Sequence, residues 1–242
     1  MNLVVDVGNT LIKMAVFQEG GLMSKVSAPV QEFQQLFFDL LSKYTIKHCL
    51  VSSVGRLNEE NRDLLNEHLN CLFLDHTTLV PFKNRYATHQ TLGVDRIALV
   101  SASVAQFPDS NVLIIDAGTC ITYDFINENN EYLGGAISPG LQMRYKSMHN
   151  QTASLPLLEM EEPQSFFGDS TNSSMHVGVV LGIVNEIDGF VKEYQTNYKD
   201  LTVILTGGDS KILCKRLKSG IFANSNFLLE GLNNILEYNT SE

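Results

Sequence analysis

Positive charge is scarce in this sequence of 242 residues, which has 17 Lys and Arg residues against 27 Asp and Glu residues and a formal net charge of −10. The Lys and Arg residues are also scattered along the chain instead of clustered. Because a nucleic-acid backbone is bound through a positively charged surface, this composition argues against nucleic acid as a main partner. The negative charge indicates solubility and does not by itself identify a partner.

Cysteine is rare as well, and its spacing carries no metal or redox signature. Cys49, Cys71, Cys120 and Cys214 lie far apart and form no Cys-x-x-Cys pair. Two or more of them could still meet in the folded chain, but their positions in the sequence do not indicate a zinc or redox site. We expect reduced, mostly buried thiols, as is usual for free cysteine.

Long apolar runs and targeting signals are missing too. No apolar run approaches the roughly 20 residues that a membrane span requires. The sequence starts with a strand-like segment, Asn2–Val5, without a basic region or a cleavage site before it. We therefore expect a cytoplasmic protein without a membrane partner.

What the sequence does contain is an alternation of strand-like and helix-like segments, in a chain that is 44% hydrophobic and can fill one or two cores. Apolar periodicity predicts strands at 3–7, 12–17, 48–54, 71–74, 121–126 and 201–205. It predicts helices at 32–44, 58–69, 95–106, after residue 140, and at 171–196 and 226–238. Such alternation is typical of an α/β fold.

Halfway along the chain the pattern starts again. The segment 111–119 repeats the form of the segment 2–10, and the aspartates Asp6 and Asp116 are 116 − 6 = 110 residues apart. A repeat of this length favours two duplicated domains over a solenoid. We place them at 1–109 and 110–242, with a short linker near Pro108. The last helix could pack against either half.

Each repeat contains an apolar strand that ends in Asp-x-Gly, followed by a polar turn and a second strand. The glycine, backbone N–H groups and a Thr hydroxyl can hold phosphate oxygens, and the aspartate can hold a divalent cation or its water ligands. Lys13 adds a positive charge beside the first turn. One such motif is compatible with an ordinary hairpin turn, but two copies together with Lys13 indicate phosphate binding. The segment 206–209 (TGGD) is a third glycine element, read as a phosphate or adenosine contact at a helix N-terminus or as a plain strand-to-helix turn.

Six stretches carry a resemblance to a known family. They read DVGNTLIK from Asp6 to Lys13, YATHQTLGVDR from Tyr86 to Arg96, DAGT from Asp116 to Thr119, GGAISPGLQMRYKSMHNQTASLP from Gly134 to Pro156, FGDST from Phe167 to Thr171, and TGGD from Thr206 to Asp209. In order and spacing they resemble the type III pantothenate kinases, within the superfamily of acetate kinase, sugar kinases, heat-shock ATPases and actin. The first turn is widespread in that superfamily, whereas the LGVDR, GG and SPG elements are specific to the family.

The resemblance implies a duplicated ribonuclease-H-like fold, also called actin-like ATPase fold, with a nucleotide cleft between the domains. It implies a homodimeric phosphotransferase acting on an alcohol group, which uses ATP and Mg²⁺ to convert pantothenate to 4′-phosphopantothenate in the first step of coenzyme A biosynthesis. A monovalent cation, K⁺ or NH₄⁺, would also be needed. The catalysis would consist mainly of positioning and charge neutralisation.

The resemblance also implies roles for individual residues. The nucleotide-binding residues would be Asp6, Val7, Gly8, Asn9, Thr10, Leu11, Ile12, Lys13, Gly118 and Thr119. The substrate-binding residues would be Tyr86, Gly93, Val94, Asp95, Arg96 and, from the other subunit of the dimer, Thr171. Asp95 would be the general base, Asp116 a ligand of the monovalent cation, and Asp6 a ligand of Mg²⁺, directly or through water. His149 matches a helical histidine, for which we expect a structural hydrogen bond, while His89 and Ser170 depart from the family's usual Pro and Asn.

Plainer explanations exist for several of these residues. Asp95 could be an N-terminal helix residue favoured by the dipole, Arg96 a surface ion pair, and Asp116 a Mg²⁺ ligand or a turn cap. Tyr86 and Thr171 could be core or capping residues.

Two other functions also stay open. One is a kinase for another small hydroxylated metabolite, although no sugar-kinase substrate loop is recognisable. The other is a nucleotide-dependent regulatory or scaffold protein of the same fold. Such a protein would not require a base beside the phosphates, and 242 residues leave no room for the extra subdomains of actin.

Overall fold

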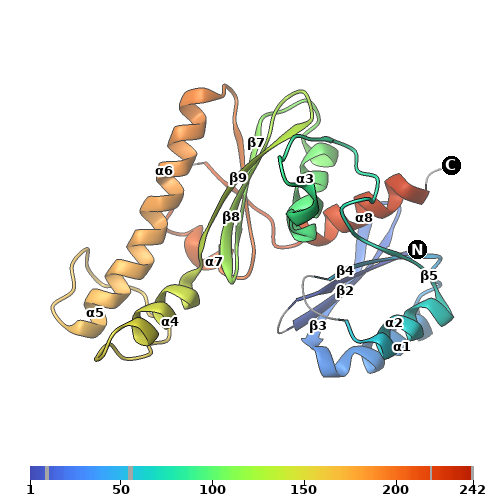
Figure 1. Cartoon of the computed structure of the whole chain (residues 1–242), viewed down its shortest axis with the longest axis horizontal. Coiled ribbons are helices and arrows are strands. Elements are labelled where there is room, and N and C mark those ends of the chain that lie inside the picture. The colour runs from blue at the N-terminus through green and yellow to red at the C-terminus, as the bar shows by residue number, and fades with distance from the viewer. Residues whose placement is uncertain (9–10, 54–56, 219, 241–242) are drawn as a thin grey trace. The chain divides into compact units, whose positions relative to one another are not determined.

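The computed structural model describes residues 1–8, 11–53, 57–218 and 220–240. The chain divides into two compact units (Figure 1). The first unit consists of 1–108, 130–132 and 226–242, and the second of 109–129 and 133–225. The division at residue 108 lies beside the proline at which a linker is predicted.

The first unit contains a five-stranded sheet in the order β3-β2-β1-β4-β5. The strands are β1 (Asn2–Val7), β2 (Leu11–Gln18), β3 (Gly21–Pro29), β4 (His48–Ser53) and β5 (Asn70–Phe73). Strand β1 runs antiparallel to β2 and parallel to β4. Alternate residues such as Leu3, Val5 and Val7 face a core that includes Phe37 of α1 (Phe33–Lys43) and Leu65, which lies in α2 (Glu59–His68). The other residues of β1, which include Asp6, therefore lie on the opposite face of the sheet.

Two helices associate with the first unit in addition to α1 and α2. They are α3 (Val94–Gln106) and α8 (Phe227–Thr240), and they pack against each other, with α8 also contacting β1 and β4. The Asn234 side-chain amide of α8 donates a hydrogen bond of 2.8 Å to the Ser101 carbonyl of α3. The position of the last helix, which the sequence left open, is therefore on the first unit. In this respect the compact units differ from the predicted ranges 1–109 and 110–242, because the apolar face of α8 is buried in the first unit.

The second unit repeats the architecture of the first sheet. Its strands are β7 (Val112–Ala117), β8 (Cys120–Ile126), β9 (Glu131–Pro139), β10 (Thr202–Thr206) and β11 (Phe222–Ala223), in the order β11-β10-β7-β8-β9. Strand β7 is antiparallel to β8 and parallel to β10, as β1 is to β2 and β4. The short strand β6 (Lys83–Asn84) pairs with Glu131 and Tyr132 at the start of β9. The repeated strand order agrees with the duplication inferred from the sequence.

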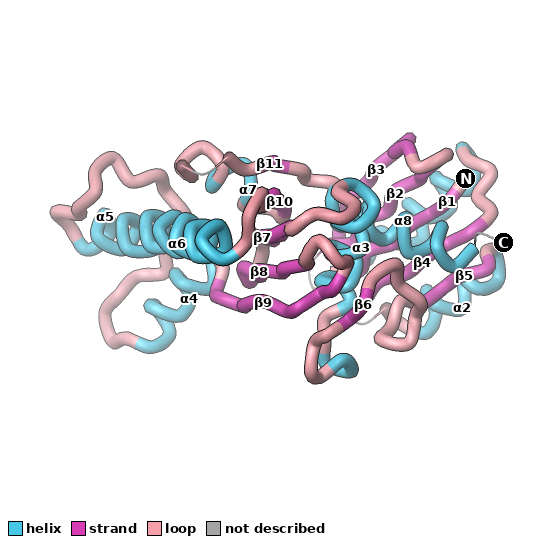
Figure 2. Tube along the Cα trace, turned by 90° about the horizontal axis from the view of Figure 1, so that it is seen from above, coloured by secondary structure: helices cyan, strands magenta, loops and turns pink. Residues whose placement is uncertain are grey.

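A long helical segment covers the core of the second unit. It comprises α5 (Thr171–His176), a π-helical turn at Val177–Leu181 and α6 (Gly182–Asn197), and it lies beside the sheet in both views (Figures 1 and 2). Val180, Ile183 and Ile187 pack in the same core as Leu113 of β7. Within the described residues, this segment alone is long and apolar enough to cross a membrane, with 44% of its most apolar window buried. Core helices of ordinary globular proteins satisfy the same criterion, so this is weak support for a membrane span.

The remaining helices are α4 (Leu141–Gln151) and α7 (Ser210–Leu213). The predicted helix after residue 140 is confirmed by α4. Strands β3 and β9 were not predicted from the sequence. Both have partly exposed, alternating burial patterns that do not produce a continuous apolar run.

Candidate active site

The first Asp-x-Gly turn connects β1 to β2 in the first unit. Asp6 lies opposite Lys13 of β2 and beside Ser52 of β4 in the strand register. The Lys13 Nζ atom is 3.4 Å from Asp6 Oδ2, and the Gly8 N–H donates a hydrogen bond of 3.0 Å to the Leu11 carbonyl, which closes the turn. The neighbouring nucleotide candidates Val7 and Ile12 are buried, whereas Asn9 and Thr10 lie outside the described residues.

The Asp6 carboxyl has an unusual electrostatic environment. Only 5% of the residue is exposed, and this burial raises the pKa of Asp6 above its ordinary value of 3.8. The charge and hydrogen bond of Lys13 oppose the increase, while the negative charge of Asp95 adds to it. Asp95 is therefore near enough to Asp6 for the two carboxylates to repel each other. The sequence separates these aspartates by 95 − 6 = 89 positions.

The Asp6 carboxylate fits a divalent cation that keeps other oxygen ligands. Mg²⁺ is commonly held by one or two carboxylates together with substrate phosphates and water. Within the described residues, no group of three or more His, Cys, Asp or Glu side chains could hold a metal ion by itself. The residues present therefore suit a Mg²⁺ ion that is shared with phosphate oxygens, and they do not form a complete protein cage.

Asp95 occupies the first turn of α3, where Gly93 is the N-cap residue and Val94 begins the helix. One carboxylate oxygen, Oδ1, accepts a hydrogen bond of 2.8 Å from the Arg96 N–H. A Cβ atom on Gly93 would collide with this oxygen, so a side chain at position 93 would displace the Asp95 carboxylate. The local backbone thus holds Asp95 in a defined orientation at the N-terminus of the helix, where a negative charge is favourable.

Arg96 follows directly and is buried, with 5% of the residue exposed. Its guanidinium lies 5.5 Å from the centroid of the Tyr86 ring, which stacks on Tyr132 at 6.0 Å. Burial excludes the surface ion pair that the sequence left open for Arg96. The structure therefore brings together Tyr86, Gly93, Asp95 and Arg96, four predicted substrate-site residues of the stretch from Tyr86 to Arg96.

The second Asp-x-Gly turn, in the second unit, is also closed by a hydrogen bond from its glycine N–H. The Gly118 N–H donates a hydrogen bond of 2.9 Å to the Cys120 carbonyl, two residues on, whereas the Gly8 N–H donates to the Leu11 carbonyl, three residues on. The Thr119 carbonyl accepts a hydrogen bond of 3.0 Å from the Gly140 N–H. Asp116 is the residue next to the end of β7, the position that Asp6 has in β1. The SPG element, although distant in sequence, is thus attached to this turn.

The third glycine element also contacts the second turn. Gly207 has a φ of +92°, and a Cβ atom there would collide with the Ala117 carbonyl and the Asp116 carboxylate. The Asp209 N–H donates a hydrogen bond of 3.0 Å to the Ala117 carbonyl, and burial raises the pKa of Asp209. The helix that follows, α7, has four residues. It is too short for a substantial helix dipole, so the strand-to-helix turn is the better description of this element.

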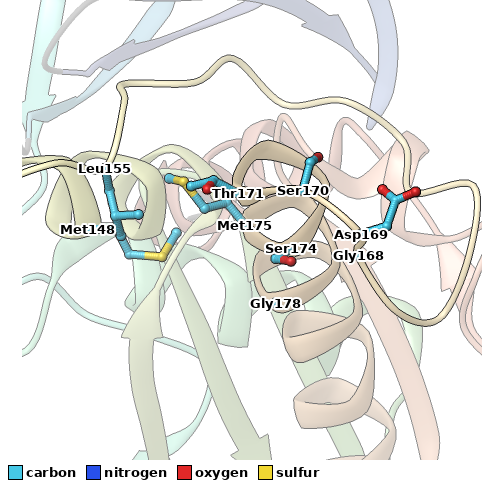
Figure 3. A pocket seen from close by; sticks show the side chains of 9 residues that line it. All are labelled: Met148, Leu155, Gly168, Asp169, Ser170, Thr171, Ser174, Met175 and Gly178. Carbon is cyan, nitrogen blue, oxygen red and sulfur yellow. The ribbon is translucent and has the colours of Figure 1, made fainter.

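Thr171 lies elsewhere in the second unit, at the first position of α5. Ser170 caps this helix, because its hydroxyl accepts a hydrogen bond from the Ser173 N–H and the Ser173 hydroxyl accepts one from the Ser170 N–H. Figure 3 shows the pocket of about 760 Å³ that Thr171 lines. The lining residues are Met148, Leu155, Gly168, Asp169, Ser170, Thr171, Ser174, Met175 and Gly178. Thr171 is exposed in this pocket and is not part of the core.

The structure also places three further residues for which the sequence contains a weak signal or none. His149 in α4 forms a hydrogen bond of 2.8 Å with the Leu155 carbonyl, in agreement with the structural role expected for it. His89 lies in a 3₁₀ turn at His89–Thr91, shortly before the N-cap of α3. Ser52 was not recognised from the sequence, and the polar end of strand β4 was the only signal that could have identified it.

Several known proteins are similar to this chain in sequence or in structure. A family model described as type III pantothenate kinase matches residues 2–193. A type III pantothenate kinase from Christiangramia forsetii is 52% identical over 243 residues, covering 100% of both chains. Among solved structures, a Baf family protein from Campylobacter jejuni matches with a TM-score of 0.65 and 22% identity, over 99% of this chain and 100% of that chain.

A glucokinase from an Antarctic psychrotroph matches with a TM-score of 0.53 and 10% identity, over 98% of both chains. At these identities the two structures bear on the fold alone. They agree with the predicted fold class, two ribonuclease-H-like domains of the actin-like ATPase type, which is thereby confirmed.

Proposed function

This chain belongs to the type III pantothenate kinases, and from that premise we propose that it transfers the γ-phosphoryl group of ATP to the hydroxyl group of pantothenate. The products would be ADP and 4′-phosphopantothenate, the first intermediate of coenzyme A biosynthesis, formed in the cytoplasm. The observation that carries the proposal is the arrangement around Asp95, whose carboxylate accepts a hydrogen bond from the N–H of the buried Arg96 at the start of α3. The candidate base and the first candidate phosphate turn both belong to the first unit.

The phosphate-binding part of the proposal rests on the two turns. Backbone N–H groups around Gly8 and Gly118, together with Thr10 and Thr119, are assigned to phosphate oxygens. Lys13 contributes a positive charge, and its side chain is 40% exposed, so it can turn from Asp6 toward a phosphate. Asp6 would hold Mg²⁺ directly or through water. The bound ion would neutralise the charge that develops on the phosphate oxygens.

The substrate part of the proposal assigns a role to each of three residues. Asp95 would accept the proton of the pantothenate hydroxyl on its carboxylate, late in the reaction, because a loose transition state requires little activation of the nucleophile. The hydrogen bond from the Arg96 N–H keeps this carboxylate oriented. The Arg96 guanidinium would pair with the carboxylate of pantothenate, and the Tyr86 ring would hold that guanidinium in place.

Two further assignments concern groups beyond this single chain. We propose that Asp116 binds a monovalent cation, K⁺ or NH₄⁺, because a carboxylate beside phosphate is repelled unless a cation lies between them. We also propose a homodimer in which Thr171 completes the pantothenate site of the partner subunit. The open pocket around Thr171 is compatible with that role.

The test is an assay of ADP release by the purified protein, coupled to a reporter reaction, with ATP, Mg²⁺ and a panel of vitamins and sugars. Pantothenate-dependent ADP release is the expected result. Release that depends on another compound would identify a different small-molecule kinase. Binding of ATP without turnover of any compound in the panel would favour a regulatory or scaffold protein.

A further inference from the structure

The hydroxyl group of Ser52 is buried, and among the described residues it has no hydrogen-bond partner. Ser52 is 0% exposed and is the last but one residue of β4. An unsatisfied buried hydroxyl costs about 1–3 kcal/mol. Most buried polar groups in proteins are paired, so an unpaired group calls for a physical explanation.

The position of Ser52 suggests what its partner is. Ser52 and Asp6 are register partners on the parallel strands β4 and β1. The neighbouring residues Val5 and Val51 face the core beneath α1 and α2. Because side chains alternate along a strand, Ser52 and Asp6 both lie on the other face. The strand register therefore places the Asp6 carboxylate, a hydrogen-bond acceptor, beside Ser52.

The hydrogen bond that Lys13 donates to the Asp6 carboxylate is weak. It is long, at 3.4 Å, and Lys13 is partly exposed. If Lys13 turns toward a phosphate during the reaction, Asp6 loses this hydrogen bond. A second donor on a rigid element would then keep the carboxylate oriented.

We propose that Ser52 is this donor, and that it acts as a positioning residue for Asp6. A small side-chain movement brings the Ser52 Oγ–H to the carboxylate, where it donates a hydrogen bond while Lys13 is engaged by phosphate. This inference rests on the proposed function, because it requires Asp6 to act in nucleotide binding. The ligand that Asp6 would hold is the one already assigned to it, a Mg²⁺ ion shared with the phosphates of ATP.

The second half of the chain has the same arrangement. Thr206 of β10 is the register partner of Asp116 on the parallel strand β7. Strands β4 and β10 occupy equivalent places in the two sheets. Each Asp-x-Gly aspartate therefore has a hydroxyl residue beside it, and Thr206 is buried as Ser52 is. A requirement for a small apolar side chain would be met by alanine as well, so the recurrence of a hydroxyl group favours a role in hydrogen bonding.

The experiment compares three variants, Ser52→Ala, Ser52→Thr and Ser103→Ala. Ser52→Thr keeps the hydroxyl group. Ser103→Ala is the matched control, because Ser103 is a fully buried serine of the same unit whose hydroxyl donates to the Leu99 carbonyl. The primary measurement is the Kd for MgATP without pantothenate, obtained by calorimetric titration. The KM for ATP and kcat are measured separately.

We expect Ser52→Ala to weaken MgATP binding about tenfold, which is typical of a lost hydrogen bond to a charged group. Ser52→Thr should bind nearly as wild type does, and Ser103→Ala should leave the affinity unchanged.

Several results would overturn the proposal. An affinity of Ser52→Ala equal to that of wild type would refute it, as would an equal loss of affinity in Ser103→Ala. Equal weakening of binding in Ser52→Ala and Ser52→Thr would assign Ser52 a packing role. If Ser52→Thr does not fold, the comparison of Ser52→Ala with Ser103→Ala decides whether the loss of MgATP affinity is specific to the Ser52 hydroxyl group. Failure of the wild-type protein to bind MgATP would instead refute the proposed function, and this inference with it.

Discussion

Replacement of Asp6 by Asn should stabilise the ligand-free protein at neutral pH while it impairs the reaction. The folded state raises the pKa of Asp6 above 3.8, chiefly through burial. Between 3.8 and the raised pKa, the folded protein therefore binds more protons than the unfolded chain, so the free energy of unfolding decreases as pH increases through this interval. Above the raised pKa, the free energy of unfolding has decreased by the full amount and no longer changes with pH because of Asp6. Asn has the same shape without the charge, and it avoids this loss.

The size of the stability change in Asp6→Asn depends on how far burial raises the pKa of Asp6 and on how far Lys13 opposes this increase. Each pKa unit corresponds to about 1.4 kcal/mol of stability. The raised pKa is already the net result of burial and of the opposing Lys13 interaction, whose Nζ–Oδ2 distance of 3.4 Å and 40% exposed lysine side chain indicate a weak pair. Such exposed pairs contribute about 0–1 kcal/mol. We expect a net gain on the order of 1 kcal/mol at neutral pH, and almost none at acidic pH, where Asp6 is protonated in both states.

The assay is urea unfolding of both proteins without nucleotide or metal, at several pH values between about 3.5 and 8. Asp75→Asn is a control of opposite sign. Hydrogen bonds from Thr77 and Thr78 lower the pKa of Asp75, so Asp75 stabilises the fold above its unfolded pKa and the contribution is lost as pH falls. Asp75→Asn should therefore be less stable than wild type at neutral pH. An Asp6→Asn protein that is less stable than wild type at neutral pH would show that the Lys13 interaction outweighs burial.

Other predictions test the proposed site. Asp95→Asn should reduce turnover by at least about a hundredfold while MgATP still binds, and near-normal turnover would refute the role of Asp95 as base. Arg96→Gln should raise the KM for pantothenate and have a smaller effect with the alcohol analogue pantothenol; equal losses would indicate that Arg96 does not bind the carboxylate. Wild type should require K⁺ or NH₄⁺ at constant ionic strength and Asp116→Asn should lose this dependence, whereas equal rates in sodium and bulky-cation buffers would exclude a cation site. Mixing an Asp95→Asn protein with a Thr171→Arg protein should partly restore activity through heterodimers, and no recovery after verified subunit exchange would exclude a composite site.

Much of the local structure could be predicted because it depends on residues that are close in sequence. The apolar runs of β1 and β7 and the helical spacing in α1 and α6 identified these elements correctly. The two Asp-x-Gly motifs indicated both the duplication and the candidate phosphate turns. Strands β3 and β9 were missed because their partly exposed residues do not form an apolar run. Their stability comes from pairing with a neighbouring strand, which a sequence window does not contain.

The environment of each functional side chain was decided only by the tertiary structure. The sequence contains Asp6, Ser52 and Asp95 at distant positions. Strand register brings Ser52 beside Asp6, and helix packing brings Asp95 near enough to act on the Asp6 carboxylate. The same is true of Gly207, which follows β10 and approaches Asp116 of the neighbouring parallel strand β7. The sequence left the place of α8 open, and the burial of its apolar face against α3 decided it. These contacts arise from many weak interactions between distant segments, whereas the composition and periodicity of a sequence record only what each segment prefers by itself.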